Sequence, residues 1–257
     1  MPVRSRRVTR LKWTAFAVCV VLAIIGALLG LRGPMLHVYE YQEDVYLSLD
    51  GSASVYVSAS IPALVALCGV DLSTDPKAPV DRAKLRAAFT GPGVSLSSIS
   101  TWRRSGRRFV TLRVDATHVS KLSFVGPLAR NVFEFSRVKA GYRVREHVGP
   151  SANWPVTGVG WDGSELVGYR WHLPAKIESH NTLDENFLRG NILVWEQPLA
   201  ARLSGVPLDM QAEMQAESIL YGTLWLFATS AGAALVLVAL VLWWIVRKGK
   251  QRHAART

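Results

Sequence analysis

Two uncharged apolar runs near the ends of the chain dominate its pattern of hydrophobic and polar positions. They cover residues 13–31 and 219–246. At about 1.5 Å per residue, each run forms a helix long enough to cross the roughly 30 Å hydrocarbon core of a bilayer. We therefore expect two transmembrane helices, with one domain at 32–218 between them.

The charges beside the two runs indicate orientation. The tails at 1–12 and 247–257 each contain five Lys or Arg residues and no acid. By the positive-inside rule both tails are cytoplasmic, which places the domain outside the cell. The first run could instead be a signal peptide. Its length and the lack of an A-x-A site favour an uncleaved anchor.

The excess of positive charge follows from this topology. The chain has 30 Lys and Arg and 19 Asp and Glu, a net charge of +11. Ten of the basic residues lie in the tails, so the 20 that remain nearly balance the 19 acids. We therefore expect the bilayer as a partner, and no nucleic acid.

Between the runs, alternating apolar positions predict a domain built mostly from strands. An Asp50-Gly51 pair separates two alternating segments and predicts a hairpin with a type I′ turn. Ser60 and Asp81 each precede an apolar helical segment and read as N-caps. The remaining strand-like segments are 94–103, 108–115, 132–138, 142–147, 165–172, 191–195 and 207–214. This order predicts an α+β fold, with an antiparallel sheet and a few short helices on one face.

The sequence gives little support for a catalytic or cofactor-binding site. The G-x-G-x-x-G spacing at 158–163 follows Pro155 and precedes a strand-like segment, so a glycine-rich turn is favoured over a dinucleotide site. Glu178 and His180 could share a strand face, but two ligands do not make a metal site. Cys68 is the one cysteine outside the apolar runs, which excludes a disulfide within the domain. We predict no enzyme, no cofactor and no metal.

Four arginines form the sharpest local feature. Arg103, Arg104, Arg107 and Arg108 flank Ser105-Gly106, so a two-residue turn would place like charges opposite each other. An acidic group should neutralise them. The candidates are lipid headgroups, an acidic partner, or acids of this domain such as Asp184 and Glu185. A solvated hairpin tip is the simpler interpretation.

Small residues within the apolar runs suggest helix packing. Gly26 and Gly30 lie in the first run, and Ala228 and Gly232 in the second, at the spacing that allows close approach. These faces could pair within one chain, with a second copy, or with another membrane protein. Chance spacing in Ala- and Gly-rich segments is the alternative.

Two late segments, 170–181 and 189–197, resemble part of the LppM-like domain of bacterial envelope proteins. The matching positions are Leu173, Pro174, Lys176, His180, Asn181, Gly190, Asn191 and Trp195. Ala175 replaces a glycine of that pattern, and an apolar anchor stands where members often have a lipidated cysteine. The resemblance implies an α+β extracytoplasmic domain at the membrane surface, with lipid or glycolipid binding and no established enzymatic activity. Taken as residues alone, Asn181 and Asn191 suit turns and Trp195 suits a core-facing strand.

Together these features predict a two-pass protein of the bacterial cytoplasmic membrane. Its non-enzymatic outer domain would bind an amphipathic envelope component, a lipid or glycolipid, in an apolar cavity between sheet and helices. The alternative is an accessory subunit of a larger membrane complex. An envelope hydrolase would require a polar cleft that the sequence does not indicate.

Overall fold

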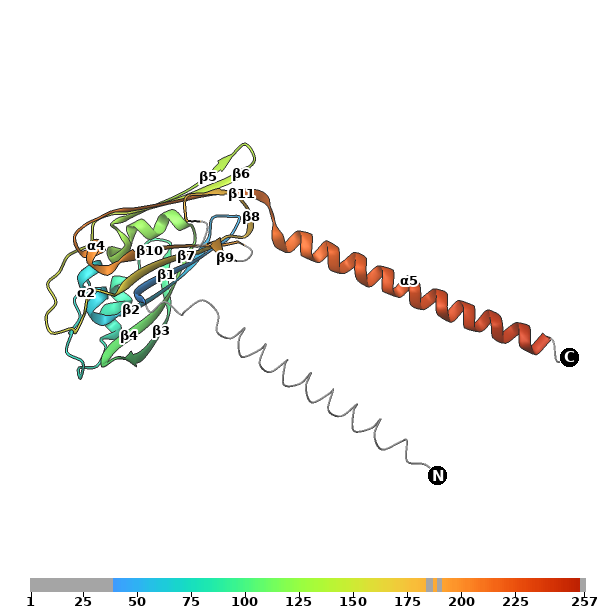
Figure 1. Ribbon diagram of the computed structural model, residues 1–257, viewed down its shortest axis with the longest axis horizontal. Coiled ribbons are helices and arrows are strands. Elements are labelled where there is room, and N and C mark those ends of the chain that lie inside the picture. Colours follow the sequence, from blue (N-terminus) through green and yellow to red (C-terminus); the bar gives the residue numbers. More distant parts are fainter. Residues whose placement is uncertain (1–38, 184–186, 189–190, 255–257) are drawn as a thin grey trace, which may run out of the picture. The chain divides into compact units, whose positions relative to one another are not determined.

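The computed structural model describes residues 39–183, 187–188 and 191–254, and the side chains among them up to residue 244 except those of 187–188 (Figure 1). Several sequence predictions fall on residues outside these ranges. They are the first span at 13–31 with Gly26 and Gly30, the acids Asp184 and Glu185, and the motif residue Gly190.

The larger of two sheets, called here the large sheet, carries the N-terminal hairpins. Its strand order is β3-β4-β2-β1-β7-β10-β9. The strands are β1 (Tyr39–Leu47), β2 (Ala53–Ser60), β3 (Val94–Arg104), β4 (Arg107–Ala116), β7 (Leu166–His172), β9 (Phe187–Leu188) and β10 (Ile192–Pro198). Neighbours are antiparallel except β1 and β7, which pair in parallel.

The small sheet has the order β5-β6-β11-β8 and is antiparallel throughout. Its strands are β5 (Asn131–Val138), β6 (Gly141–Val148), β8 (Ala175–His180) and β11 (Leu208–Ser218). The chain passes from β7 of the large sheet to β8 of the small sheet through Leu173 and Pro174. Gly141 is required here, since a Cβ at this position would lie 1.9 Å from the Met214 carbonyl oxygen of β11.

The short helices are α2 (Ile61–Cys68), α3 (Arg82–Ala88), the 3₁₀ helices η1 (Val119–Phe124) and η2 (Gly126–Leu128), and α4 (Leu199–Leu203). Two of them, α2 and α3, begin where the sequence predicts. The Ser60 hydroxyl accepts from the Ala63 N–H at 3.2 Å, and the Asp81 carboxylate accepts from the N–H groups of Ala83 and Lys84 at 3.0 Å. Both predicted N-caps are confirmed.

The predicted hairpin at Asp50-Gly51 joins β1 to β2, but its turn is longer than a type I′ turn. Leu47 pairs with Ala53, and the Ser48 N–H donates to the Ser52 carbonyl at 2.9 Å. Within this turn, Gly51 is the one residue with a positive φ, of 83°. Asp50 instead accepts from the Ser52 N–H, which suits a longer loop closed by a left-handed glycine.

One hydrophobic core joins the two sheets and the helices. Every residue of α2 is buried, and α2 contacts β1, β2 and β4 of the large sheet. Trp171 of β7 and Trp195 of β10 meet edge to face in this core, with ring centroids 4.8 Å apart. The α+β class is therefore confirmed, with two sheets and one parallel pair where the sequence predicts a single antiparallel sheet.

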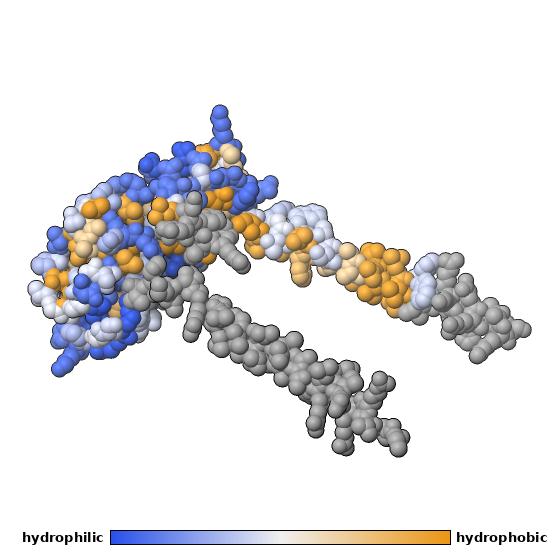
Figure 2. Space-filling model, viewed as in Figure 1, coloured by the Kyte–Doolittle hydropathy of each residue, from blue (hydrophilic) through white to orange (hydrophobic). Residues whose placement is uncertain are grey.

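The last strand leads without a linker into α5 (Ile219–Ala254). Within Ile219–Trp244, an 18-residue window has a mean hydropathy of 2.3 and contains no buried residue, so this helix is long and apolar enough to cross a membrane. Figure 2 shows apolar side chains covering the middle of this helix, whereas polar side chains cover much of the domain face in view. Ala228 and Gly232 are exposed along α5, where their packing role stays a prediction.

Candidate functional site

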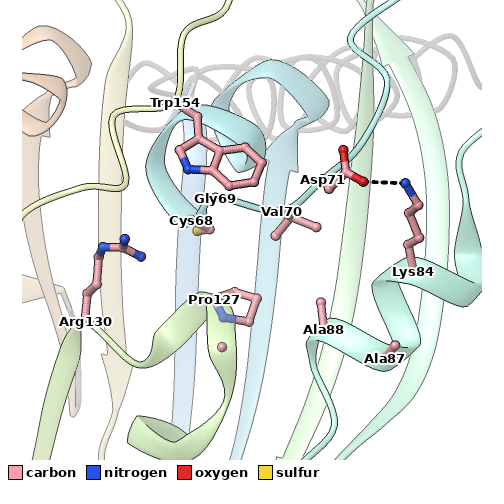
Figure 3. A pocket seen from close by; sticks show the side chains of 11 residues that line it. Cys68, Gly69, Val70, Asp71, Lys84, Ala87, Ala88, Pro127, Arg130 and Trp154 are labelled. Carbon is pink, nitrogen blue, oxygen red and sulfur yellow. Dashed lines mark hydrogen bonds and ion pairs between the residues drawn. The ribbon is translucent and has the colours of Figure 1, made fainter.

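An open cavity of about 560 Å³ lies where α2, α3 and η2 meet the loop that carries Trp154 (Figure 3). Its walls are mostly apolar. Trp154 and Pro127 face it from opposite sides, and Ala87 and Ala88 of α3 line a third side. The complete lining is Cys68, Gly69, Val70, Asp71, Lys84, Ala87, Ala88, Gly126, Pro127, Arg130 and Trp154.

The end of α2 holds Trp154 in place. Gly69 adopts a left-handed conformation with φ of 70° and ends the helix. The Ala66 and Leu67 carbonyls, which the helix leaves free, accept from the N–H groups of Trp154 at 3.3 Å and Ala152 at 2.8 Å. A Cβ on Gly69 would lie 3.1 Å from the Ala152 Cβ, so glycine here allows the loop to pack closely.

Charged side chains stand at two edges of the cavity. Lys84 donates to Asp71 at 2.6 Å at one edge, and both side chains are more than half exposed. At the other edge the exposed Arg130 makes no ion pair or hydrogen bond with another described side chain. Such an arrangement suits an elongated ligand with an apolar body and an anionic group.

The same Asp71–Lys84 pair borders a second cavity of about 350 Å³, lined also by Ile61, Leu72 and Arg108. Because the two cavities share these two side chains, the pair forms a partition between them. It is a solvent-exposed pair, and such pairs contribute little stability, on the order of 0–1 kcal/mol. A longer ligand could therefore displace it and occupy both cavities.

Cys68 lines the floor of the larger cavity as a neutral thiol. It is a free, buried cysteine. Burial, with the Glu43 carboxylate acting in the same direction, raises the pKa of the thiol to about 12. A thiol with this pKa is a poor nucleophile at neutral pH, so Cys68 serves here as a small apolar wall residue.

Behind this floor, two carboxyl groups lie inside the core. Glu43 of β1 is fully buried and accepts from the Tyr41 hydroxyl at 3.0 Å. Glu146 of β6 is 1 % exposed and accepts from the Asn131 amide at 2.9 Å and the Trp171 indole at 3.2 Å. Burial raises the pKa of Glu43 to about 7, and burial together with the Glu43 charge raises the pKa of Glu146 well above its ordinary value.

The sequence analysis missed this carboxyl pair. The signal for Glu43 was nevertheless present, because it shares a strand face with the buried Tyr41, Val45 and Leu47. No comparable local signal brings Glu146 to the same place, since it belongs to the other sheet.

The four arginines form the predicted hairpin, and three of them bind partners within the domain. Arg103 pairs with Arg108 and Arg104 with Arg107 across the turn. Arg107 donates to the buried Glu40 at 2.8 Å, and Arg104 lies 3.6 Å from the same carboxylate. Arg108 is buried and donates to the carbonyls of Ser73 and Ala78. Glu40 thus takes the role for which the sequence suggested other acids, and only Arg103 is exposed to solvent.

The glycine-rich segment at 158–163 is a loop that supports this hairpin. Gly158, Gly160 and Gly163 all have positive φ, and the carbonyls of Val159 and Gly160 accept from Arg107. The interpretation as a glycine-rich turn is confirmed. Glu178, considered above with His180, accepts from the Gln215 amide. Among the described residues, no group of three His, Cys, Asp or Glu side chains could hold a metal ion.

The residues behind the family resemblance have structural roles where they are described. The Asn181 side chain accepts from the Trp195 indole at 3.1 Å and from the Gln211 N–H at 2.9 Å, and it donates to the Asp209 carbonyl at 2.9 Å. Leu173 is buried and its N–H donates to the Asn191 carbonyl, while Pro174 accepts from the Ile219 N–H at 3.1 Å. Lys176 is exposed and His180 is partly buried on β8.

Comparisons with known proteins give one structural similarity. No protein-family model matches the chain, and no curated protein matches it. Among solved structures, it is similar to the NMR structure of the folded domain of the Mycobacterium tuberculosis LppM protein. The identity is 12%, the TM-score is 0.40, and the match covers 73% of this chain and 97% of that domain. The similarity is weak and concerns the fold alone.

Proposed function

We propose that this protein is a membrane-anchored, non-enzymatic domain that binds an amphipathic component of the bacterial envelope, a lipid or glycolipid. The observation that carries the proposal is the cavity of Figure 3, a mostly apolar volume of about 560 Å³ with the Asp71–Lys84 ion pair at one edge and the exposed Arg130 at another. This volume falls in the range of about 300–1,000 Å³ that is usual for small-molecule sites.

The apolar wall supplies the affinity in this proposal. Burial of each methylene group contributes about 0.8 kcal/mol, so six buried methylenes contribute roughly 5 kcal/mol before the cost of ordering the chain. Trp154, Val70 and Pro127 would contact the apolar part. Arg130 would bind an anionic group at the open edge.

The anchor keeps the cavity near its source of ligand. In this proposal α5 crosses the cytoplasmic membrane, the basic residues after it are cytoplasmic, and the domain lies outside. The first apolar run crosses as well, which makes the protein two-pass. Ser218 ends β11 and Ile219 begins α5, so no free linker separates the domain from the bilayer.

Native mass spectrometry of the full chain, extracted in native nanodiscs, tests the proposal. We expect a lipid that survives washing to accompany the wild-type protein. Ala87→Trp should fill the cavity and remove this lipid, whereas Ala83→Trp, on the same helix outside the lining, should retain it. Equal retention by both variants, or a stoichiometric protein partner without lipid, would reject lipid binding in this cavity.

A separate variant tests whether Arg130 binds the anionic group of the ligand. Arg130→Gln leaves the apolar walls unchanged, so the protein should still retain lipid but lose preference for anionic species. A wild-type distribution of lipid classes in this variant would remove Arg130 from the proposed site.

A further inference from the structure

The β5–β6 hairpin ends beside the point where the chain leaves the domain for α5. Gln215 of β11 pairs with Gly141, the first residue of β6. The turn residues Lys139 and Ala140 therefore lie level with Ala216 and Glu217, immediately before Ile219. At about 3.4 Å per strand residue, the turn stands only about 7–10 Å from the start of α5 along the strand direction.

Cationic side chains gather around this point. Lys139 is exposed on the β5–β6 turn, Arg137 is exposed two residues earlier near the end of β5, and Lys176 is exposed on β8, next to Ala175, which pairs with Ser218. None of the three makes an ion pair or a side-chain hydrogen bond with another described residue. We call these three residues the junction cations.

Nearby acids do not neutralise this group. Glu213 binds Arg143 at 2.6 Å, and Glu178 accepts from the Gln215 amide. Glu134 lies 3.8 Å from Arg145. Glu178 keeps its charge because the Gln215 amide is neutral, and Glu217 is a second exposed acid on the adjoining part of β11; the three cations exceed these two acids, so the junction keeps a net positive charge.

We propose that the junction cations bind the anionic headgroups of the bilayer in which α5 is embedded, and so fix the tilt of the domain on the membrane. The inference rests on the membrane anchoring by α5 proposed above. Polar headgroups add about 5–7 Å to each side of the hydrocarbon core, so the long side chains of Lys139 and Lys176, which lie within about 10 Å of the start of α5, can reach them, and the more distant Arg137 adds to the positive charge. Each such cation favours the docked state about fivefold at low salt, and less as salt screens the surface.

The arginine hairpin lies at the other end of the large sheet. Tyr46 of β1 pairs with His172, which precedes the Pro174 that contacts Ile219. Tyr39, at the opposite end of β1, accepts through its carbonyl from Arg104 at 2.8 Å. The junction cations therefore stand closer to α5 than the arginines that the sequence suggested for headgroup contact.

Headgroup quenching on the full chain tests this contact. A fluorescent amino acid at the exposed Ala140 reports its distance from nitroxide-labelled headgroups, in phosphatidylcholine vesicles with and without phosphatidylglycerol. We expect stronger quenching when phosphatidylglycerol is present. The double substitution Arg137→Gln with Lys139→Gln should lower the ratio of protein with the β5–β6 turn at the headgroups to protein with this turn in solvent, by about 25-fold at low salt. The matched pair Lys77→Gln with Arg103→Gln, both exposed and near the arginine hairpin, should leave it unchanged.

The outcomes separate this contact from the anchor. Flotation of the vesicles after a carbonate wash shows whether α5 is embedded. In one contrary result, the protein floats with the vesicles while quenching at position 140 does not depend on phosphatidylglycerol, or changes only with the Lys77 and Arg103 substitutions. Either form of this result overturns the headgroup contact and leaves the membrane anchor intact. Protein that is removed from the vesicles by the carbonate wash overturns both the contact and the anchor.

Discussion

At single positions, the charged residues of the domain divide into those paired inside the fold and those left in solvent. Glu40 is 1 % exposed and is held by Arg107 and by the Trp161 indole, which donates at 3.3 Å. Arg103, four residues earlier than Arg107, is exposed. Their substitution should therefore have very different consequences.

Arg107→Gln should destabilise the protein, because it leaves the buried Glu40 carboxylate without its closest cation. Breaking a buried pair costs about 3–5 kcal/mol, which corresponds to roughly 6–20 °C in Tm for a domain of this size. Thermal unfolding of the full chain in mild detergent measures the loss. Arg103→Gln should change Tm by little, and equal effects of the two variants would contradict the role given to Glu40.

Burial of Glu43 and Glu146 makes stability depend on pH. Their pKa values are raised in the fold, that of Glu43 to about 7, so the folded state binds more protons than the unfolded state above the ordinary carboxyl range. Below about pH 4.5 both carboxyl groups are protonated in the folded and the unfolded state, so neither lowers the stability of the fold. The free energy of unfolding then falls as the pH rises through 7, because the buried groups must ionise. For Glu43 the loss is on the order of 3 kcal/mol at most. Burial lowers the pKa of His172, which acts in the opposite sense at acidic pH.

Glu43→Gln removes the Glu43 contribution together with the effect of its charge on Glu146, whereas His172 is common to both proteins. We expect the variant to gain stability over the wild type as pH rises from 5 to 8, measured as the difference in Tm. Glu134→Gln, on the exposed face of β5, should follow the wild-type pH profile. If the difference between Glu43→Gln and wild type were constant over this range, the carboxyl pair would not be titrating.

At the scale of elements, the crossing from one sheet to the other depends on a few residues between β7 and β11. Asn181 joins Trp195 of the large sheet to the backbone of β11 in the small sheet. Asn191 contributes to the same region only through its backbone carbonyl, which accepts from Leu173. The two asparagines of the resemblance therefore differ in what their side chains do.

Asn181→Ala should destabilise the protein by about 2–4 kcal/mol, because three hydrogen bonds are lost and the Trp195 indole loses its acceptor. Asn191→Ala keeps the backbone bond and should cost little. Chemical unfolding of the two variants gives the comparison. A loss as large for Asn191→Ala would mean that position 181 has no special role in the crossing.

The elements also show which features local sequence could predict. The caps at Ser60 and Asp81 and the Arg103–Arg108 hairpin depend on adjacent residues, and all were predictable. The parallel pairing of β1 with β7 joins Tyr46 to His172 across more than a hundred residues, and no local pattern encodes it. Strand β1 begins at Tyr39, although the alternation of apolar and polar residues that predicts the hairpin starts only at Val45. The earlier part escapes this pattern because its polar residues Glu40 and Glu43 are buried.

The candidate site was predictable in character but not in place. An apolar cavity between sheet and helices was expected, yet its walls come from α2, α3, η2 and the Trp154 loop, which are distant in sequence. The arginines chosen from the sequence are mostly occupied by Glu40 and backbone carbonyls. Arg130 has no charged neighbours in the sequence, so no cluster of charges indicated it as a candidate site residue.

At the scale of the whole molecule, the apolar cavity, which we propose binds an amphipathic ligand, belongs to a domain that α5 can hold at a membrane. The cavity offers apolar walls and an exposed arginine, and α5 follows the last strand directly. A domain that samples lipids at a membrane surface and a subunit that docks on a neighbouring protein would both use such an anchor. They differ in what occupies the cavity.

Photocrosslinking in native membranes reads that occupant directly. A diazirine amino acid with a side chain about the size of leucine at Ala87 places the reactive group in the cavity without filling it, and one at Ala83 places it on the same helix outside the lining. We expect an adduct with the mass of a lipid or glycolipid at position 87 and a much weaker one at 83. A protein adduct at position 87, or equal lipid labelling at both positions, would contradict the binding of an amphipathic ligand in this cavity.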